Sequence, residues 1–537
     1  MTTTIADSGE LGSSPNGEPQ GGKGLKPGAL GLVSTLVIGV ASTAPAYSLA
    51  ATLGFVTFYV GLQSPAVMLL SFVPMLFIAA AYYYLNRADP DCGTTFTWVT
   101  RAIGPKTGWL AGWGILVTDL VVMPNLASVA GVYSFSLFGA HGIAANSSGF
   151  WVTFAGVVWI VVMTAICYIG IELSARTQVA LLGAELVILV VFAVVALSKV
   201  YGGHIAHSIH PAAAWLNPFK IPSIGALSAG MLLAVFIYWG WDTAVTVNEE
   251  AKDARRTPGR AALLSTLVLL AVYLIVSVAA QSFHGAGFLT NNSSDVLGAL
   301  ARSVLGSPWD KLLIICVLTS ASSSTQTTIL PAARSSLSMA VHKAFPKRFG
   351  DIHPKYLSPG FSTLVFGAVA VVWYVALTLI SPNDVLANSI LALGFGIAFY
   401  YGLTGFACVF YYRHHILRSF KNFIFIGLAP LLGALILTVL FIVAIFYYSD
   451  PANSNTGNQA WLPFIHFNFT FLHQHFYVKK GLGPPLVLGI GLLVIGIPLM
   501  LIFKIRNKEF FNRDREVAVS VDAPAPPLTP GVTPVTD

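Results

Sequence analysis

The chain has 537 residues, of which only 9% are charged and 55% are hydrophobic, and its mean hydropathy is +0.74. An average soluble domain has about 25% charged residues, so this composition excludes a largely disordered chain and argues against a soluble globular protein, whose surface needs more charge. We expect lipid to be its main solvent. The net charge of +7 does not indicate a nucleic-acid partner, because Lys and Arg gather in the cytoplasmic loops of membrane proteins.

Twelve apolar runs follow one another along the chain, and each can cross a bilayer as a helix of about 20 residues. We therefore predict an all-α polytopic membrane protein with about 12 transmembrane helices within residues 26–505. The runs cover residues 28–51, 64–86, 108–137, 150–171, 177–199, 225–247, 260–282, 309–333, 359–380, 384–411, 423–448 and 484–505.

Both ends of the chain lack such runs. Residues 1–25 are rich in Gly, Ser, Pro and Glu, and residues 506–537 finish in a Pro-rich stretch. These compositions predict disordered tails. We expect no signal peptide, because a basic stretch with a short apolar run after it is absent from the start.

The distribution of Lys and Arg predicts the topology. With a cytoplasmic N-terminus, 23 of the 29 basic residues lie in cytoplasmic segments and 6 lie outside. This asymmetry places both tails in the cytoplasm. We expect a multi-pass protein of the plasma membrane, in contact with lipid and without an obligatory protein partner.

The motifs favour a transporter over other membrane proteins. The chain has no HExxH or GxSxG motif, and we predict neither an enzyme nor a cofactor. A channel would need a filter motif, which is absent. A non-transporting sensor on the same scaffold is the less favoured alternative, because the tails are short for a signalling domain.

Two of the apolar runs contain signals that break a helix. The first has Pro45 in its middle, which removes a backbone donor. The sixth has Gly240 among large aromatic residues, with Asp242 two residues further on. The first and sixth runs hold matching positions if the chain contains two five-helix repeats, at about 28–199 and 225–411. In transporters such paired breaks form the substrate site. A proline or an aromatic patch alone would also fit simple packing.

At this point the chain resembles the amino acid–polyamine–organocation superfamily of permeases, over about residues 28–505. The resemblance implies a five-plus-five inverted repeat with interrupted helices 1 and 6, and two further helices at about 423–448 and 484–505. The stretches that carry it are Asp91-Cys92-Gly93-Thr94-Thr95-Phe96-Thr97-Trp98, Gly104-Pro105-Lys106-Thr107-Gly108-Trp109, Tyr238-Trp239-Gly240-Trp241-Asp242, Glu249-Glu250-Ala251-Lys252, Thr257-Pro258-Gly259-Arg260-Ala261, Ser322-Ser323-Ser324-Thr325-Gln326 and Pro331-Ala332-Ala333-Arg334.

The resemblance implies a secondary active permease that binds an amino acid or related amine between the two breaks. Unwound backbone offers N–H groups to a carboxylate and C=O groups to an ammonium. Many family members carry a Gly-small-Gly triad in helix 1. Here the corresponding residues have side chains, which would narrow the space for a substrate carboxylate. Transport of amines or polyamines, and exchange, therefore stay open as alternatives. The implied substrate-binding residues are Val40, Ala41, Ser42, Thr43, Ala44, Phe236, Tyr238, Trp239 and Gly240.

The resemblance also implies a gate. An aromatic residue on helix 6 of the family moves across the substrate, and Phe236 stands at that place. Its ring could offer cation–π attraction to an ammonium. The alternative is that the ring packs against helices 1 and 3.

Three acidic residues lie at membrane depth. Burying a charged side chain there costs free energy, so such residues usually have a function. Asp119 is in the third run, Glu185 in the fifth and Asp242 after the second break. Asp119 or Asp242 could pair with a cationic substrate, or could hold structure. Glu185 could carry a proton, hold sodium or make a fixed hydrogen bond.

The eighth run is polar in its middle, where every residue from Thr319 to Thr328 except Ala321 is Ser, Thr or Gln. In sodium-using relatives, hydroxyls here hold the ion, although such residues also pack helices together. We expect protons rather than sodium to drive transport. The possible ion site comprises Ser322, Ser323, Ser324 and Thr325.

Overall fold

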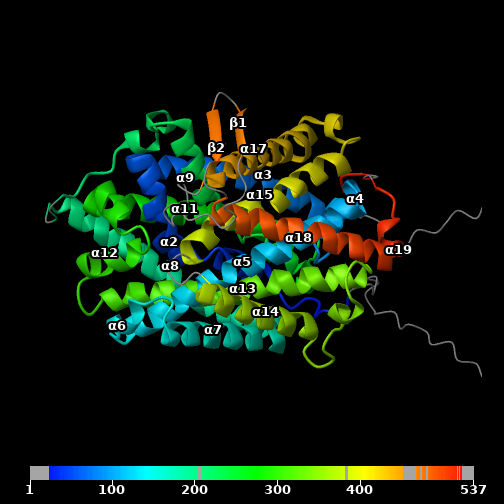
Figure 1. Ribbon diagram of the computed structural model, residues 1–537, viewed down its shortest axis with the longest axis horizontal. Coiled ribbons are helices and arrows are strands. Elements are labelled where there is room, and N and C mark those ends of the chain that lie inside the picture. The colour runs from blue at the N-terminus through cyan, green and yellow to red at the C-terminus, as the bar shows by residue number, and fades with distance from the viewer. Residues whose placement is uncertain are drawn as a thin grey trace, which may run out of the picture.

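The computed structural model describes residues 23–203, 205, 207–380, 385–450, 467–471, 474–478, 482–516, 518 and 520–522. These residues form a helical bundle (Figure 1) with one short antiparallel hairpin, in which Phe467 pairs with Val478. The elements are α1 (Leu32–Ser42), α2 (Pro45–Val60), α3 (Ser64–Ala88), α4 (Thr95–Ala102), α5 (Pro105–Leu137), α6 (His141–Ala144), α7 (Phe150–Ile169), α8 (Ile171–Tyr201), α9 (Ile224–Ile237), α10 (Thr243–Thr246), α11 (Thr257–Asn291), α12 (Val296–Leu305), α13 (Asp310–Val341), α14 (Gly360–Ile380), α15 (Val385–Tyr411), α16 (Phe420–Asn422), α17 (Ala429–Ser449), β1 (Phe467–Phe471), β2 (Gln474–Val478), α18 (Pro484–Arg506) and α19 (Lys508–Phe511).

Each predicted apolar run coincides with one helix or with a pair of helices, which confirms the all-α polytopic membrane class. Ten segments of the described chain are long and apolar enough to span a bilayer. One of them joins α1, α2 and α3, and so holds two of the predicted runs. The sixth run is divided between α9 and α10, which are both too short to span alone. The inverted repeat stays a prediction.

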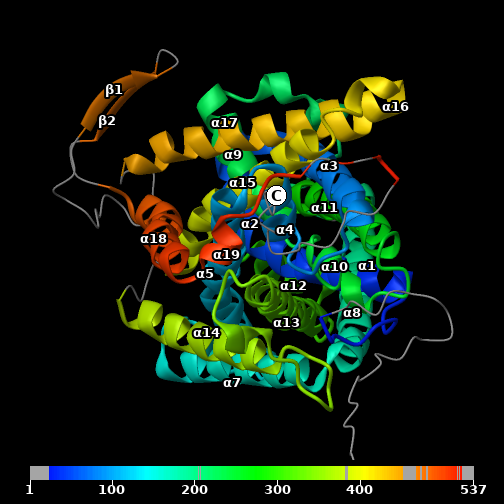
Figure 2. The same ribbon diagram turned by 90° about the vertical axis from the view of Figure 1, so that its right-hand side faces the viewer.

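The first broken helix lies inside the bundle. Helix α1 packs against α8, α10, α11 and α13, while α2 packs against α9 and α11. Helices α5 and α13 contact each other along the middle of the molecule, and α7 and α14 lie side by side on one outer face (Figure 2). Residues around the break are therefore enclosed by helices that are far apart in the sequence.

The predicted tails extend too far into the chain, and the structure corrects them. Lys23 makes ion pairs and Leu25 is buried, although both fall within the stretch predicted to be disordered. After residue 506, α19 forms with Phe510 fully buried, and Glu516 pairs with Arg101. Tertiary contacts, which composition does not reveal, order these parts. Residues 1–22 and 523–537 lie outside the described residues.

Candidate functional site

The first break lies at the end of the predicted stretch. Helix α1 continues through Val40 and Ala41 to Ser42, so these three residues are helical, contrary to the prediction of an unwound segment from Val40. Ala44 adopts a left-handed conformation, with φ 46° and ψ 67°, and Pro45 then begins α2. A left-handed alanine costs roughly 1–2 kcal/mol, so the surrounding contacts must hold the break in place.

The second break is also displaced from its predicted position. Phe236 belongs to the last turn of α9, which ends at Ile237, and α10 starts only at Thr243. The break therefore spans Tyr238 to Asp242 rather than Phe236 to Gly240. Gly240 has a φ of 116°, a conformation that residues with a β-carbon rarely adopt.

The two breaks touch each other. A β-carbon on Gly240 would lie 2.8 Å from the carbonyl carbon and oxygen of Ser42. The hydroxyl groups of Ser42 and Thr243 are 2.8 Å apart and share a hydrogen bond. The interrupted parts of the first and sixth runs therefore meet directly.

Glu185 is hydrogen-bonded to the first turn of α2. Its Oε1 accepts a hydrogen bond of 2.8 Å from the Ala46 N–H and another of 2.8 Å from the Ser320 hydroxyl. The Ser320 oxygen in turn accepts from the Tyr47 N–H at 3.1 Å. The Glu185 side chain is fully buried, and its Oε2 has no hydrogen-bond partner among the described residues. A carboxylate from α8 thus occupies the positive end of the second half-helix.

The four hydroxyl residues predicted as an ion site do not point to one place. Ser322 and Thr325 donate to carbonyl groups of their own helix, those of Leu318 and Ala321. Ser323 donates to Gln178 on α8. Of the four, Ser324 reaches the first break, donating to the Ser42 carbonyl at 2.9 Å.

Asp242 is bound by two neighbouring tyrosines of α15. Tyr400 donates to its Oδ2 at 3.1 Å, and Tyr401 donates to its Oδ1 at 2.8 Å. Trp239 extends this chain, because its ring N–H lies 2.5 Å from the Tyr400 hydroxyl. Asp119 on α5 lies close enough to Asp242 for electrostatic repulsion, and its Oδ2 has no hydrogen-bond partner within the described part of the chain.

The predicted gate ring is buried beside the first break. Phe236 is 3% exposed and meets the ring of Tyr47 edge-on, with centroids 6.5 Å apart. Tyr47 donates a hydrogen bond to Asn125 on α5. Tyr238 points elsewhere, because its hydroxyl donates to the Met68 carbonyl on α3 at 3.1 Å. The structure therefore brings Phe236 to the breaks and directs the Tyr238 hydroxyl away from them.

The residues at both breaks are buried, which closes the site to solvent in this conformation. A pocket of about 310 Å³ does open on the described surface. It is lined by Lys26, Glu172, Arg176 and Lys355 among others, and by none of the break residues. This pocket is thus separate from the predicted site.

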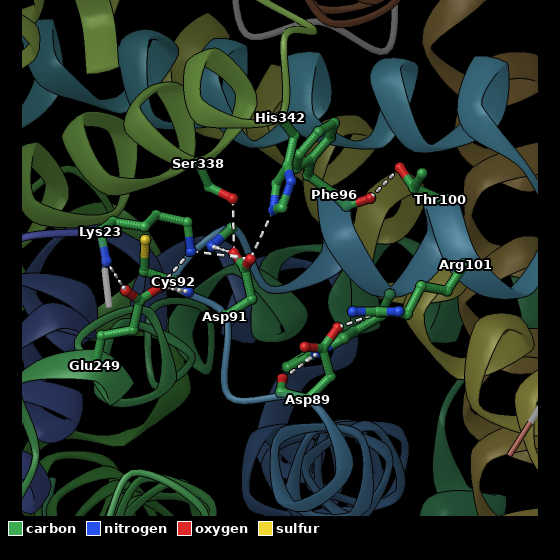
Figure 3. A network of polar contacts seen from close by, with 12 residues as sticks. Lys23, Asp89, Asp91, Cys92, Phe96, Thr100, Arg101, Glu249, Ser338 and His342 are labelled. Carbon is green, nitrogen blue, oxygen red and sulfur yellow. Dashed lines mark hydrogen bonds and ion pairs between the residues drawn. The ribbon is translucent and has the colours of Figure 1, made fainter. Parts of the chain in front are cut away.

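A second polar cluster joins segments predicted to be cytoplasmic (Figure 3). Lys23 pairs with Asp91 at 2.9 Å and also with Glu249. The other oxygen of Asp91 accepts from the Ser338 hydroxyl at 2.6 Å, and His342 lies 2.8 Å from the carboxylate. The cluster therefore ties the segment before α1 to the loops after α3 and α10 and to the end of α13.

Backbone contacts continue this connection. The Leu30 N–H donates to the Glu250 carbonyl at 3.0 Å, and the Lys252 N–H donates to the Leu30 carbonyl at 2.8 Å. Arg334 pairs through two nitrogens with Glu250, at 2.6 and 2.8 Å. Breaking such a buried pair typically costs about 3–5 kcal/mol, so this end of the bundle is firmly closed.

The electrostatic environment of the cluster favours the ionised forms of Asp91 and Lys23. Burial opposes ionisation of Asp91, but Lys23 and His342 outweigh it and hold the pKa of Asp91 well below its usual value. Burial likewise opposes charge on Lys23, but Asp91 and Glu249 raise the pKa of Lys23 well above its usual value. Ligand atoms of Asp91, Cys92 and Glu249 lie within 4.8 Å of one another. The Lys23 ammonium already supplies the cation there, so the trio fits an ion-pair cluster better than a metal site.

Several partners of the predicted residues carry little or no signal in the sequence. Ser320 lies within the polar stretch of the eighth run, where nothing distinguishes it from the neighbouring hydroxyl residues. Adjacent tyrosines in the tenth run were a usable signal for Tyr400 and Tyr401, because paired hydroxyls at membrane depth need acceptors. Nothing local in the sequence marks Lys23 as a partner of Asp91.

Comparison with known families gives a match over most of the chain. A family model described as amino acid permease matches residues 29–471. This range includes both breaks and all three membrane-depth carboxylates.

The similar proteins are transporters. An uncharacterized transporter of Mycobacterium tuberculosis is 28% identical over 308 residues, which covers 55% of this chain and 63% of the relative. The chain thus covers less than two thirds of that relative's length. The low-affinity putrescine importer PlaP of Escherichia coli is 23% identical over 77% of this chain and 88% of the relative. The serine/threonine exchanger SteT of Bacillus subtilis is 23% identical over 56% of this chain and 64% of the relative.

Proposed function

Because the chain belongs to the amino acid permease family, we propose that it is a secondary active transporter that moves an amino acid or a related amine by alternating access. The observation that carries this proposal is the contact between the two broken helices, where Gly240 meets the Ser42 carbonyl. Paired interrupted helices at the middle of a bundle are the typical substrate site of such transporters. The names of the similar proteins, which include a putrescine importer and a serine/threonine exchanger, support the same substrate range.

The substrate would bind between the breaks, beside Phe236 and Trp239. Both rings are buried in this closed conformation and lie next to groups of the two breaks. In this proposal the Phe236 ring covers the substrate from one side and withdraws when that side opens. A flat ring over an ammonium would add cation–π attraction.

Glu185 would couple transport to protons. It is a buried carboxyl group at the junction of α2, α8 and α13, with one oxygen bonded and the other without a partner among the residues that the structure describes. Protonation would weaken its hold on the Ala46 N–H, and would thereby link proton binding to the position of α2. Ser324 donates a hydrogen bond of 2.9 Å to the Ser42 carbonyl, so these two oxygens are bonded to each other in this conformation. Because Glu185 offers a buried group that can take up a proton, we propose protons as the driving ion.

The chain is a multi-pass membrane protein, and we propose the plasma membrane with both tails cytoplasmic. The uneven distribution of Lys and Arg supports this orientation. The cluster around Lys23 supports it too, because it joins several of the segments that the charge distribution assigns to the cytoplasm.

Solute counterflow tests the proposal without an imposed ion gradient. Proteoliposomes loaded with unlabelled cadaverine, lysine, serine or leucine are diluted into the same labelled compound. A permease concentrates at least one label transiently, whereas protein-free liposomes do not. Equal labelling of both preparations with every compound would contradict the proposal.

A further inference from the structure

The start of α2 has no backbone donor left for a ligand. Pro45 has no N–H group, the Ala46 N–H donates to Glu185, and the Tyr47 N–H donates to Ser320. The next N–H, that of Ser48, bonds to the Ala44 carbonyl within the turn at 2.8 Å. A carboxylate that entered the break would find none of the donors that a half-helix N-terminus normally offers.

Glu185 supplies the negative group that belongs at this position. A helix N-terminus carries a partial positive charge and is stabilised by one nearby anion. Here that anion is part of the protein, fully buried and fixed by two hydrogen bonds of 2.8 Å. A second carboxylate brought beside it would gain no free backbone donor there, and would also meet a like charge whenever Glu185 is ionised.

The other acidic side chains near the breaks also present acceptor oxygens. Asp242 accepts from two tyrosines, and Asp119 has an oxygen without a hydrogen-bond partner in the described part of the chain. Both side chains are more than nine-tenths buried. Among the described residues, no Lys, Arg or His forms an ion pair with Asp119, Glu185 or Asp242. Burial opposes the ionised form of such carboxyl groups, and a positively charged ligand would stabilise that form by pairing with it.

We propose that the substrate is an organic ammonium ion without an α-carboxylate, such as a primary amine or a diamine. Glu185 takes the place at the start of α2 that the carboxylate of an amino acid would otherwise occupy. Asp119 and Asp242 attract the ammonium group, beside the rings of Phe236 and Trp239. This inference rests on the proposed transport function and narrows its substrate class.

Matched ligand pairs test the inference, because each pair differs only by an α-carboxylate. The pairs are cadaverine with lysine, putrescine with ornithine and agmatine with arginine, and leucine and serine complete the panel. Binding is measured on the purified full-length protein in detergent at pH 7 by competition with one labelled ligand. We expect each amine to bind about 10-fold or more tightly than its amino-acid partner, because one lost charge-assisted hydrogen bond is worth about 1.5–3 kcal/mol.

Glu185→Ala tests the role of the glutamate in this preference. The substitution frees the Ala46 N–H and the Ser320 hydroxyl for a ligand carboxylate, so the ratio of amine to amino-acid affinity should fall by about 10-fold. Ser320→Ala is a milder second variant, which frees the Tyr47 N–H and should lower the ratio in the same direction. Glu172→Ala is the matched control on the same helix, because its exposed side chain pairs with Lys26 away from the breaks and should leave the ratio unchanged.

The possible results distinguish a wrong substrate class from a wrong transport function. Tighter binding of lysine, ornithine or arginine than of the matched amine, or binding of leucine or serine alone, would overturn it and leave the transport proposal standing. An unchanged ratio in both Glu185→Ala and Ser320→Ala would overturn the role of Glu185. If no compound in the panel bound to the wild type, the transport proposal itself would fail and the inference with it.

Discussion

Gly240 of the second break rests against the carbonyl group of Ser42 at the end of α1. The approach is so close that a β-carbon at position 240 would lie 2.8 Å from both the carbon and the oxygen of that group. The same carbonyl oxygen accepts a hydrogen bond of 2.9 Å from the Ser324 hydroxyl. The two breaks and α13 therefore meet at the Ser42 carbonyl.

Gly240→Val should abolish counterflow while the protein still folds and inserts. A β-branched side chain is strained at a φ of 116° and also collides with Ser42. The left-handed conformation alone costs roughly 1–2 kcal/mol for a residue with a β-carbon, which a large bundle can tolerate. Size-exclusion elution reports folding, and counterflow reports function.

Gly183→Val on α8 is the control for this substitution. A β-carbon at position 183 would meet nothing within 4 Å, so the same chemical change should leave counterflow near the wild-type rate. Normal transport by Gly240→Val would show that the contact between the breaks has no part in function.

Substitutions of Phe236 distinguish a gating role of its ring from a purely structural one. If its ring covers the substrate, Phe236→Ala should raise the apparent KM or let substrate leak, whereas Phe236→Trp should retain transport because it keeps a flat ring. The packing role predicts instead a lower melting temperature with unchanged KM, since Phe→Ala in a core typically costs about 3–5 kcal/mol. Concentration-dependent uptake and a thermal melt on the same preparations distinguish the two. Identical kinetics for Phe236→Ala and the wild type would contradict a gating role of this ring.

Asp91 should make stability depend on pH in a defined direction. Its pKa in the folded protein lies well below the usual 3.8, so its ionised form stabilises the fold above about pH 4, and this stabilisation is lost as the pH falls through the lower folded value. We expect Asp91→Asn to lower the melting temperature equally at pH 8 and pH 5, and by less at pH 3. The exposed Asp514→Asn is the control. A difference that grows as the pH falls from 5 to 3 would contradict the ion pair with Lys23.

The positions of the breaks were predictable from the sequence to within a few residues, because Pro45 and Gly240 act on the backbone of their own segment. The exact limits were not, since Val40 and Phe236 stay helical through packing that the local sequence does not encode. Composition indicated disorder around Lys23, and long-range ion pairs overrode it. The tyrosines that bind Asp242 come from α15, more than 150 residues away, so only the folded chain reveals them.

Glu185→Gln tests the coupling residue. The amide keeps an oxygen that can accept from Ala46 and Ser320, but it cannot take up a proton in this pH range. We expect accumulation driven by a pH gradient to vanish and its pH dependence to flatten, while counterflow survives. Unaltered proton-driven accumulation by Glu185→Gln would rule out this carboxylate as the proton carrier. Glu172→Gln on the same helix should behave as the wild type.

Gradient-driven uptake tests the central claim most directly. Wild-type protein and Gly240→Val are reconstituted in parallel, and labelled cadaverine, lysine, serine and leucine are offered with an inward proton gradient, an inward sodium gradient or none. We expect wild-type vesicles to concentrate at least one compound above its external level under the proton gradient, and Gly240→Val vesicles not to do so. Uptake by wild-type vesicles that never exceeds that of protein-free liposomes under either gradient would contradict a secondary active transporter.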